Sequence, residues 1–247
     1  MKILMRIIAV LLLSAAGLAL AETGEFGPLI DKKGPAVREI LDRPTLYREA
    51  KMPGLPCGSG DFGFLLDRPR LSMAIARLMD PGLDEYRIES RPDGSVHVDD
   101  QGRLVGDMEV VLRQEGKRVY YISGYWKFLL GVKFTGRMVL VPEYADRPGA
   151  GGRITDATAR GYMKVDNALA GFVARAVVYI FPAKVDARME RFADAVRKAT
   201  QAVHDDPAGV YRSLVINRNV PPEEAEEFRE RFVGKKAASV MLPGGGA

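Results

Sequence analysis

The stretch Tyr120–Val141, YYISGYWKFLLGVKFTGRMVLV, predicts two antiparallel strands joined by an apolar tip. Side chains of unlike character alternate along both arms, which is typical of strands whose two faces meet different surroundings. The tip, Phe128-Leu129-Leu130, is apolar where a hairpin turn is ordinarily polar. It is therefore either a bend that packs under a helix or a gate that contacts a lipid. In the second arm one face consists of Val132, Phe134, Gly136, Met138 and Leu140.

The residues before this stretch predict a partner for its first arm. Asp107–Arg113 alternates, and Glu115-Gly116 provides a two-residue turn that pairs Gln114 with Lys117. A slip of one residue would turn every side chain to the other face, so the turn decides which residues point inward. With this turn, the inward residues of the paired strands are Val110, Leu112, Val119, Tyr121, Ser123 and Tyr125.

Downstream, Arg153–Val165 predicts another strand after a loop at residues 142–152. One face of this strand carries mostly small side chains, which leave room that a helix or a ligand must fill. This face consists of Thr155, Ala157, Ala159, Gly161, Met163 and Val165.

Helices are predicted on both sides of the strands. Lys184–Val203 has the strongest 3.6-residue periodicity, and Leu169–Ile180 precedes it across Pro182. The apolar residues of Lys184–Val203 are Val185, Met189, Phe192, Val196, Ala199 and Val203. Further helices are expected at 35–41, 67–79 and 221–232, and short strands at 86–90 and 95–98.

The first 21 residues read as a secretory signal peptide. Lys2 and Arg6 precede an apolar run that ends at Ala19-Leu20-Ala21, an A-x-A cleavage site before Glu22. We therefore expect a secreted, periplasmic protein. Its regions are a leader at 1–21, an N-terminal extension at 22–60, a main domain at 61–205, and a C-terminal helix with a flexible tail at 206–247.

The composition excludes several classes of function. Without Lys2 and Arg6, 34 basic residues face 32 acidic ones, and a net charge of +2 does not indicate nucleic-acid binding. No later apolar run reaches the ~20 residues of a membrane span. The motifs G-x-S-x-G, HExxH and C-x-x-C are absent. Cys57 is the single cysteine, and His97 and His204 are the two histidines. We expect no catalytic residue, metal or cofactor.

The order of these elements resembles the helix-grip fold of the START-like and polyketide-cyclase superfamily, also called SRPBCC, over residues 61–205. One helix, a run of antiparallel strands and a long final helix carry the resemblance. It implies an α+β fold in which a curved antiparallel sheet grips Lys184–Val203 and holds an apolar ligand against it. The leader and Leu169–Ile180 depart from the family's pattern, and no cofactor is implied.

The expected function is binding or transfer of a lipid or another apolar molecule, with transient membrane contact. The gate residues would be Trp126, Phe128, Leu129 and Leu130. Two alternatives stay open: a cavity enzyme of the cyclase or hydrolase type, using Tyr121, Tyr125 or Asp156, and a periplasmic interaction subunit without a ligand. The predicted ligand-binding residues are Val110, Tyr121, Ser123, Tyr125, Phe134, Met138, Ala157, Ala159, Met163, Met189, Phe192 and Val196.

Overall fold

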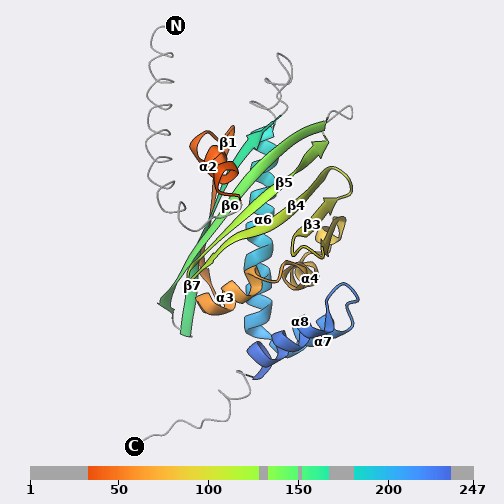
Figure 1. Ribbon diagram of the computed structural model, residues 1–247. Helices are drawn as coiled ribbons and strands as arrows, with labels where there is room; N and C mark the ends of the chain where they lie inside the picture. The colour runs from red at the N-terminus through yellow and green to blue at the C-terminus, as the bar shows by residue number, and fades with distance from the viewer. Residues whose placement is uncertain (1–32, 128–132, 150–151, 167–180, 235–247) are drawn as a thin grey trace, which may run out of the picture.

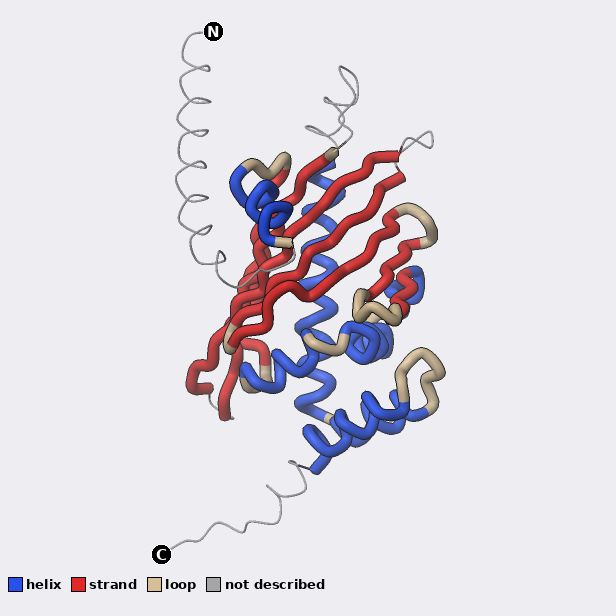
Figure 2. The backbone as a smooth tube through the Cα atoms, in the orientation of Figure 1, coloured by secondary structure: helices blue, strands red, loops and turns tan. Residues whose placement is uncertain are grey.

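The computed structural model describes residues 33–127, 133–149, 152–166 and 181–234. These residues form one seven-stranded antiparallel sheet in the order β1-β7-β6-β5-β4-β3-β2 (Figures 1 and 2). From β2 to β7 each strand pairs with the next one in the chain, and β1 pairs with the last. The strands are β1 Leu46–Leu55, β2 Tyr86–Ser90, β3 Val96–Asp100, β4 Leu104–Gln114, β5 Lys117–Lys127, β6 Lys133–Gly149 and β7 Gly152–Val165.

Helices lie on both faces of this sheet and beyond its ends (Figure 1). The longest, α6, runs along one face, and α7 and α8 follow at its C-terminal end. The fold is therefore α+β with a long helix after an antiparallel sheet, as the sequence predicts. The helical elements are α2 Gly34–Asp42, α3 Ser59–Leu66, α4 Pro69–Met79, the 3-10 turn η1 Pro81–Glu85, α6 Phe181–Asp205, α7 Pro207–Val215, α8 Pro222–Phe228 and the π-helical η3 Arg229–Val233.

Two ion pairs hold α6 from opposite sides. Asp186 accepts from Arg48 of β1, and Arg188 donates to Asp100 of β3. Residues two apart point to opposite sides of a helix, and four strands separate β1 from β3. The curved sheet thus holds α6 through strands on both sides of it (Figure 1), and the predicted helix grip is confirmed.

The other face of the sheet is covered by α2. Val37, Ile40 and Leu41 are at most 1% exposed and pack against Val119 and Tyr121 of β5. Pro35 in the first turn and apolar residues at spacings of three and four explain why this short segment is helical. The sheet thus buries apolar side chains on both faces. The remaining strand residues of this cluster are Leu112, Val139, Val141 and Tyr162.

The predicted register is right at the turn and wrong beyond it. Gln114 pairs with Lys117, and Gly116 has φ = 69°, which suits the two-residue turn. A β-bulge at residue 111 then shifts β4, so that Val110 lies opposite Tyr120 and not Tyr121. The residues of β5 that face α6 are consequently Tyr120, Ile122, Gly124 and Trp126.

Two stretches at the edges of the sheet form strands that the sequence did not predict. Residues 46–55, in the region taken as an N-terminal extension, form β1, which pairs with β7 from Leu46 opposite Met163 onward. The presumed loop at 142–152 is mostly strand, since β6 continues to Gly149 and β7 begins at Gly152. In both stretches Gly and Pro resemble turn signals, although edge positions and hairpin ends tolerate them.

The predicted helices at 35–41, 67–79 and 184–203 and the strands at 86–90 and 95–98 are confirmed, with ends that shift by a few residues. The predicted helix at 221–232 is α8 continued by η3. The leader, Phe128-Leu129-Leu130 and Leu169–Ile180 lie outside the described residues. In the described part of the chain, no helix combines the length and apolar character that crossing a bilayer requires.

Candidate functional site

The surface between α6 and the sheet is packed on the side of β1 and β7. Ala157 and Ala159 are at most 5% exposed and contact Met52, Phe62 and Ala193. The room that small residues leave on β7 is therefore filled by side chains of β1, α3 and α6. Leu55 and Tyr144 complete this cluster, with Val196 and Leu140 at its margin.

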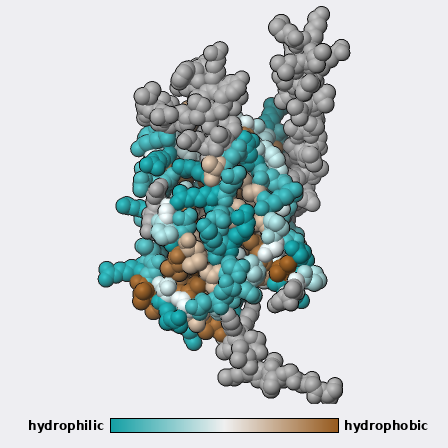
Figure 3. Space-filling model, turned by 180° about the vertical axis from the view of Figure 1, so that it is seen from behind, coloured by the Kyte–Doolittle hydropathy of each residue, from teal (hydrophilic) through white to brown (hydrophobic). Residues whose placement is uncertain are grey.

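The same face is less covered on β3, β4 and β5. The side chain that α6 presents on this flank, Phe192, is 49% exposed although it belongs to the apolar stripe of the helix. Figure 3, which views the molecule from the side of α6, shows apolar residues among polar ones mainly toward the end where α4, α7 and α8 lie. Six apolar residues facing α6 are only half-buried: Val96, Val98, Leu104, Met108, Val110 and Ile122.

A row of glycines crosses this half of the sheet. Gly106, Gly124 and Gly136 lie side by side on β4, β5 and β6, on the face that looks toward α6. A Cβ atom at Gly124 would lie 2.2 Å from the carbonyl oxygen of Val105, so the bent backbone leaves no room for one. The row also leaves a strip without side chains between Leu104 and Met108.

Trp126, at the end of β5, lies between the packed side of this face, at β1 and β7, and its less covered side, at β3 to β5. It packs with Met138 and Met163 of the sheet and with Val185 and Met189 of α6. Trp126 was predicted as a gate residue, and the other three gate residues lie outside the described part of the chain. Trp126 itself lies at the end of β5, on the face toward α6.

Most predicted ligand-binding residues lie on the face toward α6, but three do not. Tyr121 is 6% exposed under α2, and Ser123 and Tyr125 follow it on the same outer face, opposite Arg137 and Thr135. The bulge at residue 111 explains this error, because it separates the face of Leu112 from that of Val110. Those on the α6 side are Val110, Phe134, Met138, Ala157, Ala159, Met163, Met189, Phe192 and Val196.

The sequence did not single out the polar pair that lies on this face. Asp100 is 1% exposed, and its Oδ2 accepts from Nη2 of Arg188 at 2.5 Å. The sequence Asp99-Asp100 before a turn looks like solvated surface, and only the strand register shows that Asp100 turns inward while Asp99 turns outward. No local sequence signal distinguishes the two.

A polar groove of about 860 Å³ opens beside α3, at the end of the sheet formed by the β4–β5 turn. Its central group is Asp67, which accepts from Nε and Nη2 of Arg118, each at 2.9 Å, and from Nε of Arg113 at 3.2 Å. Burial alone would raise the pKa of Asp67, but the hydrogen bonds from the two arginines outweigh it and hold this pKa below its ordinary value. The groove is thus built from internally paired charges.

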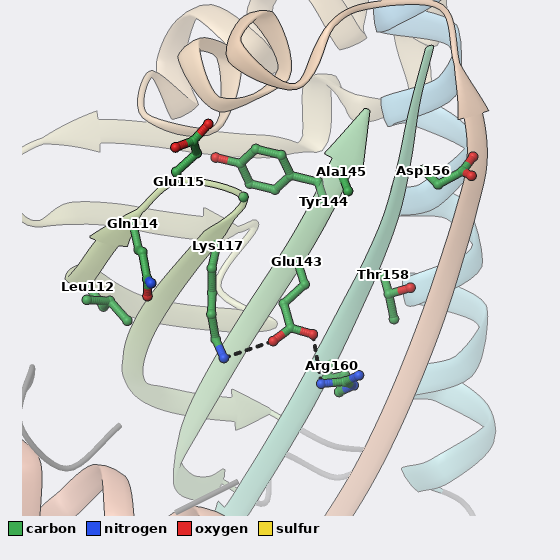
Figure 4. Close-up of a pocket in the computed structure, with 11 residues that line it drawn as sticks. Leu112, Gln114, Glu115, Lys117, Glu143, Tyr144, Ala145, Asp156, Thr158 and Arg160 are labelled. Carbon is green, nitrogen blue, oxygen red and sulfur yellow. Dashed lines mark ion pairs between the residues drawn. The ribbon is translucent and has the colours of Figure 1, made fainter. Parts of the chain in front are cut away.

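A second hollow of about 530 Å³ lies on the outer face near the same turn (Figure 4). Glu143 there bridges Lys117 at 2.8 Å and Arg160 at 2.9 Å. Thr158 also lines it, as does Asp156, one of the three residues of the cavity-enzyme alternative. This hollow is separated from α6 by the sheet, so it is not part of the surface predicted for an apolar ligand.

Nucleophilic and metal chemistry find little support in the described residues. Burial raises the pKa of Cys57 to about 12, and the carboxylates of Asp61 and Asp146 add to this, so its thiol is protonated at neutral pH. His97 lies on the outer face, where its Nδ1 is 2.7 Å from Asp107. Within the described ranges, His, Cys, Asp and Glu side chains form no group of three or more that would hold a metal ion.

Comparisons with known proteins find likeness of structure only. No protein-family model matches the chain, and no curated protein matches its sequence. A conserved protein from Geobacillus kaustophilus superimposes with a TM-score of 0.40 and 14% identity, over 64% of this chain and 95% of that one. Norcoclaurine synthase from Thalictrum flavum gives 0.39 and 15%, over 63% and 85%. Ara h 8.0201 gives 0.34 and 13%, over 64% and 97%.

These identities and TM-scores carry no conclusion about activity or ligand. The assignment to the α+β class, with a curved antiparallel sheet around a long helix, rests on the strand order and on the contacts of α6. Membership of the START-like superfamily stays a prediction, as does the division of the chain into four regions.

Proposed function

We propose that this protein binds an apolar small molecule, such as a lipid, between α6 and the strands β3, β4 and β5. The observation that carries the proposal is the unequal burial of one continuous apolar face. Side chains on β1 and β7 are packed, whereas Val98, Met108 and Ile122 on the same face are half-buried, and Phe192 of α6 is 49% exposed.

Energetics favour a ligand at this place. Each apolar side chain left partly in water forgoes about 25 cal/mol for every Å² that a ligand would cover. Apolar sites with few polar groups are the usual form of small-molecule pockets. The polar groove beside α3 and the hollow on the outer face are lined by paired charges and suit an apolar ligand less well.

The proposal extends to export and exchange. The leader at 1–21 would direct the protein across the inner membrane, and mature chains would begin at Glu22. The apolar tip Phe128-Leu129-Leu130, next to Trp126, would contact a bilayer while the ligand enters or leaves. Replacement of Leu129 and Leu130 by Asp should then slow ligand exchange with liposomes and leave thermal unfolding unchanged; unchanged exchange would remove the gate.

The main test uses two matched substitutions on opposite faces. Val98→Phe adds bulk beside the glycine row on the face toward α6, because Val98 pairs with Gly106, whereas Val105→Phe adds the same bulk on the outer face. The chain has one tryptophan, Trp126, whose emission should shift when an uncharged apolar probe such as N-phenyl-1-naphthylamine binds.

Wild-type protein and Val105→Phe should bind the probe, and Val98→Phe should bind it at least tenfold more weakly with an unchanged unfolding transition. Organic extraction of gently purified wild-type protein should release the natural ligand for mass spectrometry. Equal binding by the two variants, or an empty extract from wild-type protein that also binds no probe, would contradict the proposal.

A further inference from the structure

Asp100 is a buried acid with one oxygen that no described residue satisfies. Its Oδ2 accepts from Arg188, but its Oδ1 is buried and has no hydrogen-bond partner among the described residues. An ionised carboxylate accepts hydrogen bonds and donates none. A buried acceptor without a partner costs about 1–3 kcal/mol, and more when it is charged. The group that complements Oδ1 is therefore a hydrogen-bond donor.

This oxygen lies on the face that α6 covers. Asp100 ends β3 opposite Leu104 of β4, and Leu104 pairs with Trp126 of β5. Val98, one position earlier on the same face, borders the glycine row. The carboxylate therefore borders the half-buried apolar surface, in the row that continues through Leu104 and Trp126 to Phe134.

Arg188 connects α6 to this same surface, because its side chain reaches Asp100 of β3. It lies four residues, or one turn, before Phe192, so both side chains leave α6 on one flank. Arg188 reaches β3 on this flank, and Phe192 is the half-exposed apolar residue beside it. The polar pair and the half-exposed Phe192 thus lie on one flank of α6.

We propose that Asp100, held by Arg188, is the polar anchor of the ligand site, and that the ligand is an apolar molecule with a hydroxyl or amino head group. This inference rests on the proposed function and adds the chemistry of the head group. A carboxylate or phosphate head group would face the lone pairs of Oδ1 and be repelled, because Arg188 is already engaged by Oδ2.

The test compares the binding of three compounds that share a twelve-carbon chain and differ in the head group: 1-dodecanol, its methyl ether and dodecanoate. Binding to the full chain is followed through Trp126 emission and by calorimetry. Dodecanol should bind wild-type protein about tenfold or more tightly than either of the others, since a hydrogen bond to a buried charge is a strong one. The comparison needs no variant and so does not depend on the folding of one.

Two matched substitutions then locate the effect. In Asp100→Asn the amide oxygen can still accept from Arg188 while the amide nitrogen replaces Oδ1, so the preference for the alcohol over the ether should vanish. Asp99→Asn, the neighbouring change on the outer face, should keep the preference. Persistence of the preference in Asp100→Asn would place the anchor elsewhere and overturn the assignment.

The outcomes separate the two proposals. If wild-type protein binds alcohol and ether equally, or dodecanoate most tightly, the anchor is wrong while apolar binding stands. If no dodecyl compound or apolar probe binds the folded wild-type protein, both proposals fail together.

Discussion

The two halves of the surface beneath α6 are built from the same residue types but are filled to different degrees. On β1 and β7, Met52, Ala157 and Ala159 are at most 5% exposed, because α3 adds Phe62 and α6 adds Ala193. On β3 to β5, Val98, Met108 and Ile122 are half-buried and belong to none of the buried clusters, although α4 packs against α6 and β2 nearby. Apolar pattern alone therefore does not distinguish a core from a binding surface; the covering elements decide.

The largest expected effect comes from adding bulk to each half. Ala159→Leu should lower the free energy of unfolding by about 3 kcal/mol, because the packed half has no space for three more carbon atoms. Val98→Leu on the half-buried side should change it by less than about 0.5 kcal/mol. Urea denaturation measures both. Similar losses at the two sites would mean that the halves are equally packed.

A smaller loss is expected at the charged junction where α3 meets the β4–β5 turn. Asp67→Asn removes the charge that Arg118 and Arg113 bind and should cost about 2 kcal/mol at pH 7. The folded pKa of Asp67 is lowered, so its contribution is present above the unfolded pKa of about 3.9 and is lost as pH falls through the folded pKa.

Urea titrations of this variant should therefore converge with wild-type protein at acid pH. Asp166→Asn, the same change at an exposed ion pair with Arg137, should cost less than about 1 kcal/mol. A pH-independent difference at Asp67 would show that packing and not charge holds the junction.

The smallest effect concerns reactivity and not stability. Cys57 borders the packed half, and burial raises its pKa to about 12, so iodoacetamide at pH 8 should alkylate it far more slowly than an unfolded chain. In a Cys57→Ala background, a cysteine introduced by Val98→Cys should react faster than Cys57 does in the native protein. Mass spectrometry of timed samples gives both rates, and the reverse order would contradict the difference between the halves.

The sequence predicts the elements of this fold well and their faces less well. Periodicity locates α6 and the alternation locates β5 and β6, because both patterns are local. The bulge at residue 111 has no glycine or proline to mark it, and it inverted the assignment of Tyr121, Ser123 and Tyr125. The strand β1 was missed because its Pro53-Gly54 resembles a turn.

The arrangement of the candidate site was predicted least well where it depends on contacts between residues that are far apart in the sequence. Met138, Met163 and Met189 lie on the face toward α6, as their apolar stripes predict, and their contact with a ligand stays a prediction. Asp100 was missed because its burial depends on Arg188, which lies 88 residues away in the chain. Contacts of this range follow from the tertiary fold and leave no local pattern.

The pairing of β1 with β7 has a consequence for how the protein folds. Leu46 finds its partner at Met163, across roughly a hundred residues of chain, so one margin of the sheet stays open until synthesis has passed β7. We expect the pairing of β1 with β7 to be the slow, late step that limits the folding rate. Until it happens, the unsatisfied backbone of β7 is the place where two nascent chains would most readily pair with each other.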